Sequence, residues 1–82
     1  MTDEIRRVLK EHARLRVDVD ELPEHADLFQ AGMTSHASIN VMLALENAFD
    51  VEFPDRLLSR SVFSSIASIR AALDEIAIED VA

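Results

Sequence analysis

One glycine and two prolines are the only strong helix breakers in this 82-residue sequence. Gly32, Pro23 and Pro54 leave long uninterrupted stretches rich in Ala, Leu, Arg and Glu, which are residue types with high helix propensity. A chain of this length is near the smallest size that buries a core of its own, so it forms one domain. We therefore predict an all-α fold in a single domain over residues 1–82.

Apolar residues at helical spacing predict three main helices and one short one. The expected elements, each after its capping residue, are residues 3–15 after Thr2, residues 35–49 after Thr34, residues 56–59 after Asp55, and a final helix after Ser64 or Ser65. Their apolar stripes are Ile5, Val8, Leu9 and His12 in the first helix, Val41, Met42, Leu45, Ala48 and Phe49 in the second, and Ile66, Ile69, Leu73 and Ile76 in the last.

The connection over residues 17–33 shows no sustained period. A loop this long is unusual in a compact domain and normally has a role. We expect its apolar residues to pack into the core, namely Val17, Val19, Leu22, Leu28 and Phe29.

Acidic residues outnumber basic ones sixteen to eight, which gives a formal charge of −8. Nucleic-acid binding needs a basic surface, so it is not expected here. The charge favours a partner with a positive patch, and it is equally compatible with simple solubility.

There is no cysteine, and the three histidines (His12, His25 and His36) lack metal-site spacing. No signal peptide or membrane span is expected, which makes the cytoplasm the default location.

Ser35 is the residue best placed for chemistry. Gly32 can take a positive φ and turn the chain into the second helix, and Thr34 is a natural cap. Ser35 would then be the first helical residue, with its hydroxyl exposed. A phosphodiester at that position would meet unpaired backbone N–H groups and the positive end of the helix dipole.

The surrounding segment resembles the acyl and peptidyl carrier protein superfamily. The matching residues are Asp27, Leu28, Phe29 and Gly32, then Ser35, then Leu45, Glu46 and Phe49, and finally Phe53, Pro54 and Asp55. The resemblance implies an acyl-carrier-protein-like bundle. It also implies that a phosphopantetheinyl transferase attaches 4′-phosphopantetheine from coenzyme A to Ser35, and that the thiol of this arm carries cargo as a thioester. The protein would then be a substrate of other enzymes and not an enzyme itself.

Two departures from the family pattern bear on the cargo. Thr34 and His36 flank the serine, where the family usually has an acidic or polar residue before it and Leu or Ile after it. Between Thr34 and Asp50, only Glu46 and Asp50 are acidic, whereas fatty-acid carriers have a dense row of carboxylates on this helix. The segment is more similar to the small stand-alone aminoacyl carrier proteins, which are served by seryl-tRNA-synthetase-like amino acid:carrier protein ligases. This resemblance implies a small amino acid such as glycine or alanine as cargo.

A second, partly apolar face of the same helix carries His36, Ile39 and Leu43. It is a candidate docking patch, to which Arg56 and Arg60 could add contacts. The alternative for Ile39 and Leu43 is extra core against the long loop, and the alternative for the two arginines is a solvated face. We expect a monomer that serves the transferase, the ligase and an acceptor enzyme not identified by the sequence. The alternatives are an acyl or peptidyl carrier for fatty-acid, polyketide or nonribosomal peptide synthesis, and a helical interaction domain without a prosthetic group.

Overall fold

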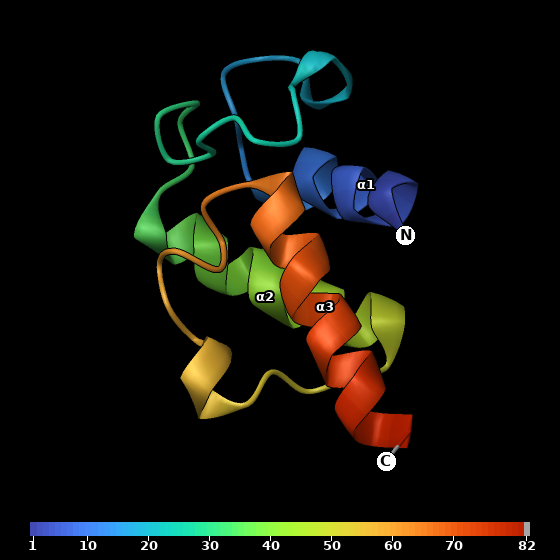
Figure 1. The fold of residues 1–82 in the computed structure, drawn as a ribbon. Coiled ribbons are helices and arrows are strands. Elements are labelled where there is room, and N and C mark those ends of the chain that lie inside the picture. Colours follow the sequence, from blue (N-terminus) through green and yellow to red (C-terminus); the bar gives the residue numbers. More distant parts are fainter. Residues whose placement is uncertain (82) are drawn as a thin grey trace.

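A computed structural model describes the backbone of residues 1–81 and the side chains of residues 1–77. It contains three α-helices, α1 (Thr2–His12), α2 (Ser35–Phe49) and α3 (Ile66–Val81), and two short 3₁₀ turns, η1 (Val19–Glu21) and η2 (Asp55–Leu57). Figure 1 shows α3 crossing in front of α2, with the long α1–α2 loop at the top of the bundle. The predicted all-α bundle with a long first loop is confirmed for the described residues.

The core draws on the helices and on the loops between them. The helices contribute its centre, with Ile5, Leu9, Val41, Leu45, Ile66 and Ile69 all fully buried. The loops add Val19, Leu28, Met33, Phe53, Leu57 and Phe63. No polar or charged residue among those described is buried. None of the helices within residues 1–81 combines the length and apolarity needed to span a membrane.

The predicted boundaries are right for α2 and need correction for α1. Helix α1 stops at His12, three residues early, because Arg14 takes the left-handed conformation with φ 55°. Ala13 closes the helix by donating its N–H to the Leu9 carbonyl at 2.9 Å. Thr2 does not cap α1: it is the first helical residue, and its hydroxyl oxygen instead accepts a hydrogen bond from Arg70 of α3.

The predicted turn at residues 56–59 is also displaced. It runs from Asp55 to Leu57, with Pro54 in the capping position, so Asp55 is not the cap. Helix α3 is capped by Ser65, one of the two predicted residues. Its hydroxyl oxygen accepts from the Ser68 N–H at 3.1 Å, and the Ser68 hydroxyl oxygen accepts from the Ser65 N–H at the same distance.

The long loop packs as predicted, with one exception. Val19 and Leu28 are buried, and Leu22 and Phe29 pack against the core from its edge. The expectation for Val17 is wrong, because its side chain is 48% exposed. Val17 immediately precedes the Asp18 that caps η1, which brings Val19 into the core instead. Ala48, placed by its spacing on the buried stripe of α2, is likewise exposed.

Two leucines of α2 offer a matched test of this packing. Leu45 is fully buried and Leu43 is 49% exposed. We expect Leu45→Ala to lower the free energy of unfolding by about 2–5 kcal/mol, since it leaves a cavity. Leu43→Ala should change it by no more than about 0.5 kcal/mol, as is usual at the surface. Urea denaturation of both variants gives the comparison, and equal losses would contradict the core described above.

Candidate functional site

Ser35 is the first residue of α2, and it is exposed. Thr34 precedes it in an extended conformation, and its hydroxyl oxygen accepts a hydrogen bond from the Ala37 N–H at 3.0 Å. The predicted cap is therefore confirmed. Within the described residues, the N–H groups of Ser35 and His36 make no hydrogen bond, which is expected in the first turn of a helix.

Gly32 makes the turn that leads into α2. Its φ is +120°, a backbone conformation that residues with a side chain rarely adopt. A Cβ at this position would also lie 3.1 Å from Cγ of Arg16, which is a tight contact. Both constraints favour glycine here, as the sequence predicted.

Asp27 holds the segment before Gly32 in place. One of its carboxylate oxygens accepts hydrogen bonds from the N–H groups of Phe29 and Gln30, at 2.9 and 3.3 Å. Leu28 is fully buried, and its N–H donates to the Ser64 carbonyl at 2.7 Å. Each named residue of the Asp-Leu-Phe-x-x-Gly motif thus has a structural role. Asp27 closes a turn with its carboxylate, Leu28 packs in the core, Phe29 packs at the edge of the core, and Gly32 takes the positive φ that leads into α2.

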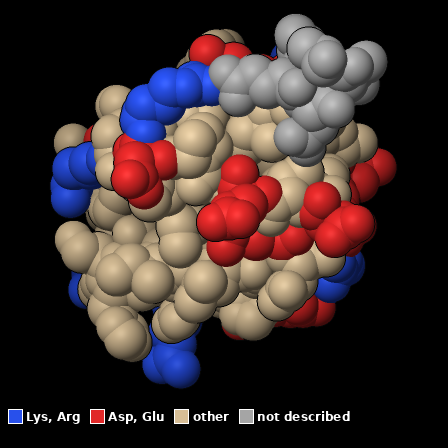
Figure 2. All heavy atoms as spheres, turned by 90° about the horizontal axis from the view of Figure 1, so that it is seen from below, with Lys and Arg blue, Asp and Glu red and all other residues tan. Residues whose placement is uncertain are grey.

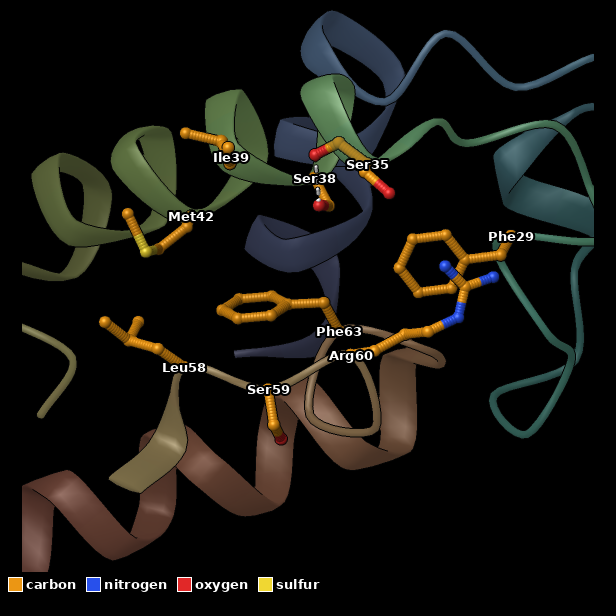
Figure 3. Close-up of a pocket in the computed structure, with 9 residues that line it drawn as sticks. All are labelled: Phe29, Ser35, Ser38, Ile39, Met42, Leu58, Ser59, Arg60 and Phe63. Carbon is orange, nitrogen blue, oxygen red and sulfur yellow. Dashed lines mark hydrogen bonds between the residues drawn. The ribbon is translucent and has the colours of Figure 1, made fainter. Parts of the chain in front are cut away.

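A groove of about 510 Å³ opens beside Ser35. Figure 3 shows one wall formed by α2, with Ile39 and Met42, and the other by the segment that leads from η2 to α3, with Leu58 and Phe63. The residues that complete its lining are Phe29, Ser35, Ser38, Ser59 and Arg60. The Ser35 hydroxyl points toward the end where Phe29 and Arg60 lie (Figure 3). Ser38 is engaged by the backbone, since its hydroxyl donates to the Ser35 carbonyl at 2.6 Å.

The five predicted docking residues are only partly brought together. His36, Ile39 and Leu43 are all exposed, so Ile39 and Leu43 are not extra core. Ile39 lines the Ser35 groove, whereas Leu43 lines a separate hollow between α2 and α1. Arg60 lies at the groove, and Arg56 pairs with Glu75 of α3 at 3.3 Å.

Several groove residues were not predicted as part of a site. The sequence pattern predicts Met42 and Phe29 as core residues and predicts no role for Leu58. Leu58 is 45% exposed although it follows the buried Leu57. An adjacent leucine pair on a short turn is the only signal that could have indicated it, because one of the two must face outward.

Acidic side chains gather at the far end of α2. Glu46, Asp50, Glu52 and Asp55 line a hollow there, while the first turn of α2 has no acidic residue. Figure 2, which views the molecule from below Figure 1, shows acidic groups close together in the middle of the face in view. The acidic residues of α2 therefore lie toward the end of the helix away from Ser35. Among the described residues, no three potential ligands cluster as a metal site requires.

The site fits a phosphopantetheine group on Ser35. The hydroxyl is exposed and free to be esterified, two unbonded N–H groups lie beside it, and an adjoining groove has apolar walls. Comparison with known families agrees: residues 3–76 match the family described as the phosphopantetheine attachment site. The chain belongs to this family. Phosphopantetheine is accordingly its prosthetic group.

The individual relatives have more specific descriptions than the family does. The chain is 46% identical over 69 residues to an aminoacyl carrier protein of Agrobacterium fabrum, covering 84% of this chain and 83% of the relative. It also matches an Agrobacterium tumefaciens carrier protein in crystal structures with an engineered Bradyrhizobium japonicum glycine:[carrier protein] ligase. With AMP bound, the TM-score is 0.88 at 43% identity, over 90% of this chain and 99% of that one. The complex with ATP gives the same TM-score and identity, over 92% and 97%. A solution structure from Agrobacterium tumefaciens matches over both full lengths, with a TM-score of 0.77 and 41% identity.

The Thr34 cap gives a local test of the site. Thr34→Ala removes the hydroxyl that accepts the Ala37 N–H, and we expect it to lower the free energy of unfolding by about 0.5–2 kcal/mol. Thr34→Ser keeps an acceptor at the same place and should retain most of that stability. Thermal or urea unfolding distinguishes the two, and equal destabilisation by both would argue against the cap.

Proposed function

We propose that this chain is an aminoacyl carrier protein whose phosphopantetheine is attached to Ser35. The observation that carries the proposal is the exposed Ser35 hydroxyl at the start of α2, where it opens onto a groove. The 46% identity to a curated aminoacyl carrier protein supports the choice of cargo class. The arm supplies the thiol to which cargo is joined as a thioester.

In the attachment step, the Ser35 oxygen forms a bond to the phosphorus that bears pantetheine in coenzyme A. The bond to the bridging oxygen breaks, 3′,5′-ADP leaves and the serine proton is lost. We assign removal of that proton to the phosphopantetheinyl transferase. His36 is a poor candidate for this step, because adjacent residues on a helix point about 100° apart.

The role proposed here is that of a substrate handed between enzymes. An amino acid:carrier protein ligase would activate a small amino acid with ATP and pass it to the thiol, and a further enzyme would accept it. The likeness to a carrier solved with a glycine:[carrier protein] ligase favours glycine, with alanine the next choice. Because the selecting pocket belongs to the ligase, cargo choice is a property of the partner.

We place this role in the cytoplasm, where coenzyme A and ATP are available, and assign it to one carrier domain acting as a monomer. For docking we propose the exposed residues around the groove and along α2. Ile39 and Arg60 lie on the groove itself, while His36, Leu43 and Arg56 extend the surface around it.

The attachment site is tested by intact mass after coexpression with a promiscuous phosphopantetheinyl transferase. We expect the wild-type chain to gain one phosphopantetheinyl group and Ser35→Ala to gain none. Ser38→Ala is the matched control, because Ser38 lines the same groove but donates its hydroxyl to a backbone carbonyl. It should be modified like the wild type. An unmodified wild type would favour the interaction domain without a prosthetic group.

The docking surface is tested by loading of the modified protein with glycine by an amino acid:carrier protein ligase. Ile39→Asp places a charge on an apolar contact, and we expect kcat/KM for loading to fall at least about tenfold, which corresponds to about 1.4 kcal/mol. Leu43→Asp tests the adjoining hollow in the same assay. Val17→Asp is the control, since Val17 is similarly exposed (48% against 54% for Ile39) but lies in the first loop, outside the groove.

Normal loading of both α2 variants would remove these residues from the docking surface. Loading of the wild type only by enzymes of fatty-acid, polyketide or nonribosomal peptide synthesis would replace the aminoacyl assignment with the acyl or peptidyl one.

A further inference from the structure

Arg60 has no carboxylate partner among the described residues, and the same holds for Arg6, Arg14 and Arg16. Four others are ion-paired: Arg7 with Glu4 and Glu11, Lys10 with Asp20, Arg56 with Glu75, and Arg70 with Glu24. Of the four basic residues without a carboxylate partner, Arg60 is the one that lines the groove beside Ser35, where it is available for an anion from outside.

An aromatic ring holds Arg60 in place instead. Its guanidinium carbon lies 3.9 Å from the centroid of the Phe29 ring, which is a cation–π contact. Phe29 is itself fixed, because its N–H donates to Asp27 and it packs against the core. The hydrogen bond from Leu28 to Ser64 ties this turn to the segment that carries Arg60. The charge is therefore positioned by two loops that are joined to each other.

This fixed charge is at the serine end of the groove. Phe29, Arg60 and Ser35 all line it, and Figure 3 shows the guanidinium across the Phe29 ring on the side toward which the Ser35 hydroxyl points. Beyond them the walls are apolar, with Ile39 and Leu58 about half exposed. The order along the groove is thus cation first, then apolar side chains.

The phosphopantetheine arm has the same order of chemical groups. It begins with a phosphodiester of one negative charge and continues with a carbon that bears two methyl groups, before its two amides and thiol. We propose that Arg60, held on Phe29, is the counter-charge of the phosphodiester on Ser35 and directs the arm along the groove between α2 and Leu58. This inference rests on the proposed attachment at Ser35. Arg60 is here a positioning residue, not a catalytic one.

The geometry also gives the arm a resting place. An arm lying against Ile39 and Leu58 covers apolar surface that the structure leaves exposed. A partner that docks on the groove would displace it and draw out the thiol. Because the ion pair between Arg60 and the phosphodiester is exposed, it is weak enough to break each time a partner enzyme binds.

The test is NMR on the modified protein, with methyl groups labelled. In the wild type we expect nuclear Overhauser contacts between the two arm methyl groups and the side chains of Ile39, Met42 or Leu58. We also expect the Arg60 side-chain N–H to shift between the unmodified and modified forms. In Arg60→Gln the methyl contacts should be lost. In Phe29→Leu, which keeps an apolar edge but removes the ring, they should weaken.

Arg56→Gln is the matched control, because it removes the same charge from the same connecting segment but from a residue paired with Glu75. Its arm contacts should match those of the wild type. Absence of contacts in the modified wild type, or their survival in Arg60→Gln, would overturn the inference while leaving attachment at Ser35 intact. Failure of the proposed function is seen separately, as a wild type whose mass does not increase.

Discussion

The hydrogen bond from the Leu28 N–H to the Ser64 carbonyl, at 2.7 Å, joins the two long loops of this fold. Leu28 is fully buried, so the bond forms where one loop enters the core. The start of α2 follows this point along one loop, and the start of α3 follows it along the other. This one hydrogen bond therefore connects the segments that form the two walls of the groove, and it positions Ser35 relative to the opposite wall.

The long first loop serves stability and function together. A chain of 82 residues has little apolar surface to spare, and three helices alone would leave its core thin. Val19, Leu28 and Met33 supply buried side chains from the loop. Because the same segment contains the turn that presents Ser35, the site is held by core packing, and the protein needs no separate element to support it.

The features that could be predicted from the sequence are those that depend on contacts between residues close together in the chain. The bounds of α2, its cap at Thr34 and the turn at Gly32 followed from neighbouring residues, and they were predicted correctly. The end of α1 was missed because Arg14 adopts a left-handed conformation that nothing in its residue type favours. The contact between Phe29 and Arg60 joins residues 31 positions apart. No periodicity can report such a contact, since it is created by the way the two loops pack.

The net charge of −8 poses a problem for a protein that must accept a group from anionic coenzyme A. The distribution of that charge resolves it. The acidic hollow begins near Glu46, eleven residues along α2 from Ser35, which is about 16 Å at a rise of 1.5 Å per residue. Screening at 0.1 M salt has a length of about 10 Å, so most of that repulsion is lost before it reaches the serine. Near Ser35 the first turn of α2 has no acid, and Arg60 lies on the same groove. An acidic carrier can therefore present a locally receptive end to a phosphate, while its remaining charge keeps copies of the chain apart.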